Sequence, residues 1–263
     1  MTRRVCYDGG GTVREETSVG AEGNRTAKAD SGKPDAGRLD GFPFFASLTP
    51  REREDVVRLC RWKRFGADEQ IIDRQSESRD IYFVVAGKVR ILIYSIGGRE
   101  VTLADIGQGE YFGELAAIDG APRSASVMAV DDTLVAVMSP DQFVGLISRH
   151  PALALDVMRR LTAVVRHATN RIMELSTLGA NNRVHAELLR QARAVKPNAD
   201  GQVELRPIPV HSDMASRVST TRETVARVLN DLARNGVVRR ERDALVVTDI
   251  EYLEDLVENV RGE

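Results

Sequence analysis

One segment of the chain combines residue types that could bind a small phosphorylated ligand. It runs from Phe112 to Ser126 and reads FGELAAIDGAPRSAS. It has the pattern of a strand that ends in glycine, then Glu114, one helical turn, a Gly-Pro turn, and Arg123 followed by a hydroxyl. Helix-start N–H groups and arginine donate hydrogen bonds to a phosphate, and a carboxylate accepts one from a sugar hydroxyl. The segment therefore offers one partner for each polar end of a cyclic nucleotide. Taken singly, Gly113 also fits an ordinary turn and Arg123 a solvated surface charge.

A second segment, residues 210–232, has the pattern of two short helices that read a nucleic acid. Met214 and Val218 form one apolar stripe at helical spacing, and a second stripe follows at i, i+3, i+4 and i+7, formed by Val225, Val228, Leu229 and Leu232. The connection at Ser219 and Thr220 is short, so the helices must cross steeply. This is the helix-turn-helix arrangement.

The face of the second helix opposite its apolar stripe carries polar groups suited to base edges, and consists of Arg222, Glu223, Ala226, Arg227 and Asn230. Arginine can bond guanine O6 and N7 together, and glutamate can accept from cytosine N4. Thr220 to Glu223 also fits a capping box, in which Glu223 would support the helix instead of reading a base. Between Arg206 and Arg242 there are eight arginines against four acids, so this region is locally basic.

The composition argues against several classes of protein, including membrane proteins and disulfide-rich proteins. The chain has 263 residues, 42% of them hydrophobic and 29% charged, and a net charge of −2, as expected for a soluble protein of one or two domains. It lacks an apolar run of the roughly 18 residues that span a bilayer and an apolar leader, so we expect a cytoplasmic protein without a membrane partner. Its two cysteines, Cys6 and Cys60, are too few for a disulfide framework, and we expect both to be reduced. No catalytic set, metal spacing or phosphate loop is present, so we expect neither an enzyme nor a metal site.

Several elements must position the two segments. Residues 1–40 are rich in glycine and charge and are predicted to form a disordered arm. A helix is predicted after Thr49, with Pro50 at its first position and Glu52 as capping-box acid. Between residues 64 and 139, short runs rich in β-branched residues alternate with turn signals, which predicts a small antiparallel barrel or sandwich.

After Pro140 the pattern becomes helical. A helix around residues 141–148 precedes a long one, residues 152–178, whose coiled-coil seam is predicted at Val157, Leu161, Val164, Ala168, Leu175 and Leu178, with an interruption at Arg171. Its 27 residues would span about 40 Å, which favours a partner helix from a second subunit. The alternative is that the helix packs wholly against its own β-domain. Helices at 181–195 and 249–260 and wing strands at 237–240 and 244–247 complete the expected elements; the wing arginines could contact phosphates or simply be solvated.

The first segment resembles the phosphate-binding cassette of cyclic-nucleotide-binding domains, FGELAL…PRxA, and the likeness extends over residues 64–139. The resemblance implies that Glu114 accepts from the ribose 2′-hydroxyl and that Arg123 and Ser124 hold the cyclic phosphate. It also implies that Gly113 permits close approach of the backbone and that Leu115 lies at the site. Where the catabolite-activator branch places two hydroxyls on the long helix near the purine, this chain has only Thr169. The ligand implied is cyclic AMP, with cyclic GMP left open.

The run from Thr221 to Arg227 resembles the SRETVxR recognition helix of the CRP branch of the CRP/FNR family of transcription regulators. The resemblance implies that Arg222, Glu223 and Arg227 read a TGTGA-like half-site, with Ser212 and Thr221 near phosphates. Ser212 stands where the family usually has glutamine.

Together the resemblances imply an α+β protein with four regions. These are an arm (1–40), a cyclic-nucleotide-binding β-roll of jelly-roll type (41–150), a dimerisation helix (151–179) and a winged helix-turn-helix (180–263). The implied activity is that of a homodimer, paired through residues 152–178, which binds double-stranded DNA in response to the nucleotide and acts with RNA polymerase. The alternatives are a regulator of the same fold that needs no ligand or senses another small molecule, such as carbon monoxide through haem, and a nucleotide-gated subunit of an enzyme or channel.

Overall fold

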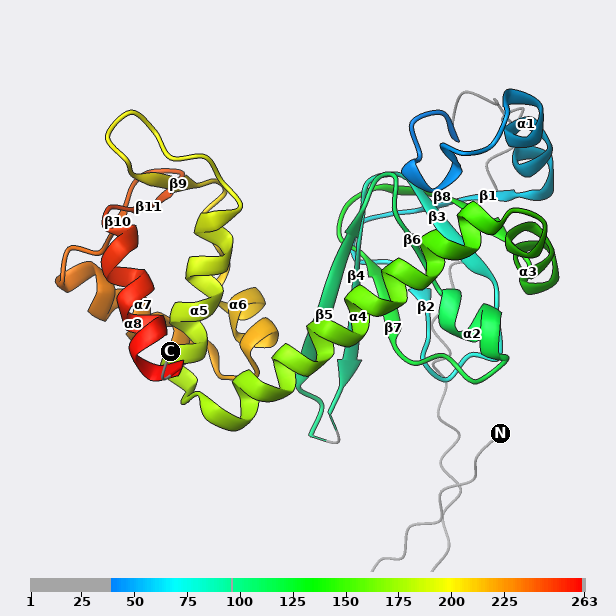
Figure 1. The fold of residues 1–263 in the computed structure, drawn as a ribbon. Helices are drawn as coiled ribbons and strands as arrows, with labels where there is room; N and C mark the ends of the chain where they lie inside the picture. Colours follow the sequence, from blue (N-terminus) through cyan, green and yellow to red (C-terminus); the bar gives the residue numbers. More distant parts are fainter. Residues whose placement is uncertain (1–38, 96, 262–263) are drawn as a thin grey trace, which may run out of the picture.

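The computed structural model describes residues 39–95 and 97–261, which form a β-rich part and a smaller helical part joined by one long helix (Figure 1). The predicted arm lies almost wholly outside the described residues. Its last apolar residue, Leu39, is completely buried in the core of the β-rich part. The packed chain therefore includes residue 39, before the predicted boundary at 41.

The β-rich part is built from two four-stranded antiparallel sheets, in the orders β1-β8-β3-β6 and β2-β7-β4-β5. The predicted sandwich or roll is thus confirmed. Its sharp turns need glycine: Gly87, between β3 and β4, has φ +85°, and a Cβ there would lie 2.6 Å from the Asp132 carbonyl oxygen. The strands are β1 (Arg61–Phe65), β2 (Gln70–Ile72), β3 (Ile81–Ala86), β4 (Lys88–Tyr94), β5 (Glu100–Gly107), β6 (Tyr111–Phe112), β7 (Ser126–Ala129) and β8 (Thr133–Met138).

Short helices close one end of this roll over an aromatic core. They are η2 (Pro43–Phe45), α1 (Pro50–Leu59) and α3 (Pro140–Arg149), and Phe45, Phe83 and Phe143 are completely buried. The predicted capping box of α1 is present: the Glu52 N–H donates to the Thr49 hydroxyl at 3.3 Å, and the Thr49 N–H donates to the Glu52 carboxylate at 2.8 Å. Burying these rings removes a large apolar area from water, which stabilises this end of the roll.

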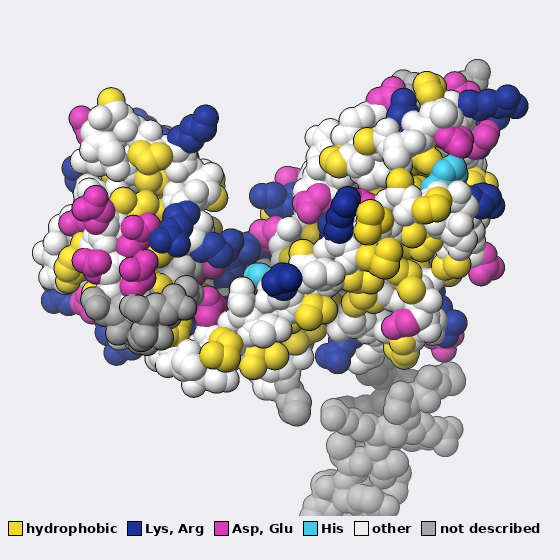
Figure 2. All heavy atoms as spheres, viewed as in Figure 1, with side chains coloured by type: hydrophobic (Ala, Val, Ile, Leu, Met, Phe, Trp, Pro, Cys, Tyr) yellow, Lys and Arg dark blue, Asp and Glu magenta, His cyan; other side chains and the backbone are white. Residues whose placement is uncertain are grey.

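The long helix α4 (Pro151–Thr177) is attached to the roll by its first two turns, where Leu153 and Val157 are buried. Further along, large apolar side chains on α4 are exposed and form a band on the surface in Figure 2. This helix has the predicted length, but Val157 and Leu178 are 3% and 4% exposed and cannot face a second subunit. The predicted seam is therefore wrong at these two positions.

The C-terminal part is a winged helix-turn-helix, as predicted. Its three-stranded sheet has the order β10-β11-β9, and its core includes Leu188, Met214, Val225 and Leu253. The strand β9 was not predicted. The elements are α5 (Ala180–Arg193), β9 (Val203–Leu205), α6 (His211–Val218), α7 (Arg222–Arg234), β10 (Val238–Arg240), β11 (Leu245–Val247) and α8 (Ile250–Arg261). No helix in the described part of the chain is long and apolar enough to cross a lipid bilayer.

Candidate functional site

The ligand-binding candidates lie where β6 passes through Gly113 into the short helix α2 (Glu114–Asp119). Gly113 has φ +86°, a backbone conformation that L side chains rarely adopt. A Cβ at this position would lie 2.8 Å from Arg123 Nη1 and 2.9 Å from the Asp80 carbonyl oxygen. Glycine is required both by the backbone and by the close approach of Arg123.

Arg123 is the central polar group of this segment and is only 5% exposed. Its guanidinium donates to the carbonyl oxygens of Gly113 (3.2 Å) and Asp80 (2.8 Å) and to the Ser78 hydroxyl (3.0 Å). Its Nε, also buried, has no hydrogen-bond partner. A buried N–H group without an acceptor is costly, because it has lost its hydrogen bond to water without gaining another. Such a group is well suited to an anionic ligand.

Glu114 lies close enough to Arg123 for the two charges to interact. Burial lowers the pKa of Arg123, and Tyr82, Asp80 and Glu114 oppose that shift through their charges. Glu114 is itself 8% exposed, at the first position of α2. The carboxylate and the guanidinium predicted to bind opposite ends of one ligand are therefore both buried, and each lies within range of the other's charge.

The remaining ligand-binding candidates are more exposed. Ser124 and Leu115 lie at the surface of the same segment. Thr169 is exposed on α4, and its hydroxyl donates to the Val165 carbonyl oxygen at 3.0 Å. The sequence reasoning missed Ser78, Asp80 and Tyr82, which orient Arg123 from about forty residues upstream. Nothing in local spacing marks them, since β3 and its preceding loop meet the cassette only in the folded roll.

Substituting Gly113 tests the packing of this segment. Gly113→Ala is expected to lower the free energy of unfolding by about 2 kcal/mol, because the Cβ adds backbone strain and displaces Arg123 or Asp80. Urea denaturation measures the change. Gly179→Ala is the matched control, since Gly179 has an ordinary φ of −62° and a Cβ there would meet nothing within 4 Å. Equal stability of the two variants would contradict the close packing of Gly113 against Arg123.

The DNA-reading candidates lie on α6 and α7. The turn between these helices is made by Ser219, which has φ +51° and so reverses the chain tightly. Thr221 caps α7 by accepting from the Thr224 N–H at 3.2 Å. The capping box considered for Thr220 and Glu223 is therefore absent. Hydrogen bonds from its own N–H and from the Thr221 side chain lower the pKa of Glu223, so this exposed side chain is a carboxylate at neutral pH.

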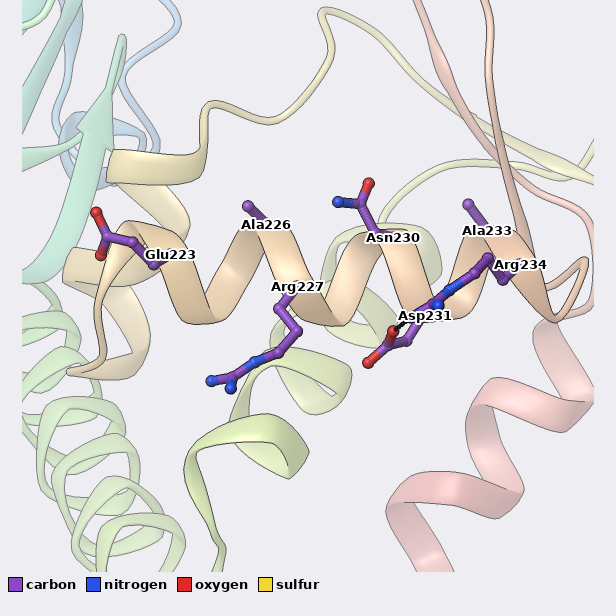
Figure 3. A pocket seen from close by; sticks show the side chains of 7 residues that line it. All are labelled: Glu223, Ala226, Arg227, Asn230, Asp231, Ala233 and Arg234. Carbon is purple, nitrogen blue, oxygen red and sulfur yellow. Dashed lines mark hydrogen bonds and ion pairs between the residues drawn. The ribbon is translucent and has the colours of Figure 1, made fainter.

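The outer face of α7 is open and polar. Arg222, Glu223, Arg227 and Asn230 are exposed, whereas the apolar stripe at Val225, Val228, Leu229 and Leu232 is buried. Figure 3 shows Glu223, Ala226 and Asn230 in a row along the helix, with Arg227 on the adjoining side. Ser212 and Thr221 are exposed near the starts of α6 and α7. A helix that presents such a row can enter a major groove.

Comparison with known proteins agrees with both parts of the structure. Residues 62–150 match the family model for a cyclic nucleotide-binding domain, and residues 182–256 match that for a Crp-like helix-turn-helix domain. The cyclic AMP receptor protein of Thermus thermophilus is 34% identical over 218 residues, which are 83% of this chain and 98% of that protein. The chain belongs to the CRP/FNR family of transcription regulators.

Three further relatives have lower sequence identity to this chain. A CRP-like cAMP-activated global transcriptional regulator of Mycobacterium tuberculosis is 28% identical, over 66% of this chain and 77% of its own length. Among solved structures, a transcriptional regulator of the CRP/FNR family from Thermus thermophilus is 26% identical with a TM-score of 0.55, and covers 76% of this chain and 99% of its own. A CooA mutant from Carboxydothermus hydrogenoformans superposes with a TM-score of 0.68 at 22% identity, covering 77% and 90% of the two chains, and shows the shared fold.

Proposed function

We propose that this member of the CRP/FNR family is a cytoplasmic homodimer that binds cyclic AMP and then recognises a palindromic, TGTGA-like DNA site. The observation that carries the proposal is the buried guanidinium of Arg123, whose Nε has no partner and whose charge interacts with Glu114. A cyclic nucleotide satisfies both groups at once, because its phosphate is an anion and its ribose 2′-hydroxyl is a donor.

Each pocket residue has a distinct part in this binding. Arg123 and Ser124 donate to the cyclic phosphate, and Glu114 accepts from the ribose hydroxyl. Gly113 keeps the cradle free of a Cβ, and the exposed Leu115 covers the sugar. Thr169 is the group on α4 that could contact the purine, so cyclic GMP is the rival ligand. No metal is needed by this chemistry.

The exposed apolar residues of α4 support pairing with a second subunit. Met158, Val165 and Ile172 recur every seven residues and are 55%, 64% and 64% exposed. Leu161, Ala168 and Leu175 alternate with them, so the steps are three and four residues, as in a two-stranded coiled coil. This seam keeps the predicted positions Leu161, Ala168 and Leu175. It replaces Val157 and Val164 with the residues that follow them, Met158 and Val165. Arg171 then lies outside it and donates to the Ser219 hydroxyl at 3.3 Å.

Pairing through α4 gives each dimer two recognition helices. On successive major grooves these would lie about 34 Å apart. Arg222, Glu223 and Arg227 would read bases, and Ser212 and Thr221 would contact phosphates. A ligand that favours one dimer arrangement over another shifts the population toward it, which couples the nucleotide to DNA. RNA polymerase is the further partner that a regulator of transcription requires.

Replacing Arg222 tests base reading. Arg222→Ala is expected to cost about 1–3 kcal/mol on the palindrome and to relax the base preference at one position of each half-site. Fluorescence anisotropy against a set of single-base variants of the site measures both effects. Arg240→Ala, in the exposed wing, is the comparison, because we expect Arg240 to contact a phosphate, and losing such a contact weakens binding to all sequences alike. A uniform loss for Arg222→Ala would instead make Arg222 a phosphate contact.

The decisive experiment for the whole proposal is a titration of a labelled TGTGA-type palindrome with the full chain. It is performed without nucleotide, with cyclic AMP and with cyclic GMP, at one stated salt concentration. We expect tight binding only with cyclic AMP. Equal binding in all three arms would identify a regulator that needs neither nucleotide.

A further inference from the structure

The first helix of the helix-turn-helix packs against the β-rich part of the same chain. In this contact α6 lies on β5, and two arginines meet two aspartates. Arg90 on β4 donates to Asp105 on β5 at 3.0 Å and to Asp213 on α6 at 3.1 Å. Arg217, one turn further along α6, also donates to Asp105. These four side chains, here called the docking cluster, alternate in charge and sum to zero.

Three of the four side chains of the docking cluster are largely shielded from solvent. Arg90, Asp105 and Arg217 are 16%, 21% and 20% exposed, and Asp213 is 42% exposed. Beside it, the hydroxyls of Thr102 on β5 and Ser216 on α6 form a hydrogen bond at 2.8 Å, and Thr102 is buried. Burial alone would raise the pKa of Asp105, but the hydrogen bond from Arg90 and the charge of Arg217 outweigh it and lower that pKa. Because partly buried, hydrogen-bonded ion pairs are specific in geometry, this contact favours one orientation of α6 on the roll.

The docked orientation leaves the DNA-reading surface free. The contact with the roll uses Asp213, Ser216 and Arg217 on α6, whereas the exposed candidates lie at Ser212 and along the outer face of α7. A helix-turn-helix held in one orientation loses less entropy when two copies bind adjacent half-sites than one that turns freely on a linker.

We propose that the docking cluster holds the helix-turn-helix on the roll of its own subunit and that this docked arrangement is the one that binds DNA. The inference rests on the proposed function. It adds a residue-level route from the ligand to α6. Arg123 and Ala125 lead directly into β7, and on β7 Met128 pairs with Arg90 of β4. The segment that would hold the ligand is therefore continuous with β7, the strand that neighbours Arg90 of the cluster.

A cross-link tests whether docking occurs in solution. Thr102→Cys with Ser216→Cys, in a Cys6→Ser background, replaces two hydroxyls that already touch. The native Cys60 thiol will not interfere, because burial raises its pKa to about 12. On mild oxidation we expect an intrachain disulfide, seen as faster migration at monomer mass on a non-reducing gel. No cross-link, or a cross-linked dimer, would overturn docking within one subunit.

The same cross-linked protein tests whether docking favours DNA binding. We expect the oxidised form to bind the palindrome at least as tightly as the reduced form in saturating cyclic AMP. A loss of tenfold or more on oxidation, reversed by reductant, would show that the docked arrangement opposes binding and would overturn the proposal. If neither form bound DNA, the proposed function would fail and this inference with it, but the cross-link would still report whether the domains dock.

Charge reversal supplies an independent measurement on the reduced, cysteine-unmodified protein. Asp213→Arg places three arginines around Asp105 and is expected to weaken palindrome binding roughly tenfold. Arg90→Glu in the same chain restores an ion pair across the contact, so the double variant should recover part of that affinity. Asp200→Arg, an equal charge change on an exposed loop of the same domain, is the control and should not weaken binding. Equal affinities for Asp213→Arg and Asp200→Arg would overturn the role of the cluster.

Discussion

Replacing Arg123 with methionine is expected to weaken cyclic AMP binding by at least about a hundredfold. Hydrogen bonds to charged groups contribute about 1.5–3 kcal/mol each, and the guanidinium can direct two N–H groups at a phosphate. Losing two such bonds therefore costs roughly 3 kcal/mol or more, and each 1.4 kcal/mol is a factor of ten in affinity. Isothermal titration calorimetry on the full chain measures the change directly.

Two further variants separate binding from folding. Arg123 also donates to the carbonyl oxygens of Gly113 and Asp80, so its loss could loosen the roll; a thermal melt of each variant reports this. Glu114→Gln keeps an acceptor for the ribose hydroxyl and should lose less affinity than Arg123→Met. Arg149→Met, which removes an exposed arginine on α3, is the control. Equal heats of binding for the wild type and Arg123→Met would remove Arg123 from the ligand site.

The cassette could be read from the sequence because its chemistry is local. Gly113, Glu114 and Arg123 lie within eleven residues, and the turns that join them are set by Gly120 and Pro122. The partners that hold Arg123 in place could not be read, because Ser78 and Asp80 are 45 and 43 residues away. The docking cluster is more distant still: Arg90 and Asp213 are 123 residues apart and meet only through tertiary structure. Periodicity gives no information about such pairs.

The α4 seam shows a different limit. Val157 with Met158, and Val164 with Val165, are adjacent apolar pairs, so the apolar residues at these positions fit two registers of a heptad. In the sequence only Arg171, which interrupts the first register, distinguishes them. The structure makes the choice because Val157 packs into the core of the roll, which turns Met158 and Val165 outward. The sequence of α4 was enough to predict that it is a helix. Which of its faces is exposed depends on which side chains pack against the roll, and this is settled only by the tertiary structure.

Placing two glutamates on the revised seam is expected to break the dimer and to reduce palindrome affinity by two orders of magnitude or more. Val165→Glu with Ile172→Glu changes two side chains that are each 64% exposed in the subunit, so its own core is untouched. In a parallel pair of helices each glutamate would face its counterpart, and like charges on an apolar seam are strongly unfavourable. Linking two DNA-binding modules gains about 10²–10⁴ in affinity, and a monomer loses that gain.

The control for this pair uses the same helix and the same change of charge. Ala163→Glu with Asn170→Glu lies two residues earlier, which turns each glutamate about 200° around α4 to another exposed face. Analytical ultracentrifugation should give a monomer for the seam variant and a dimer for the control, both with wild-type binding to a single half-site at high protein concentration. If the control dissociated and the seam variant did not, the subunits would pair through the opposite face of α4. If both remained dimeric, the dimer contact would lie outside this helix, and the spacing of the two recognition helices would have to be set by another element.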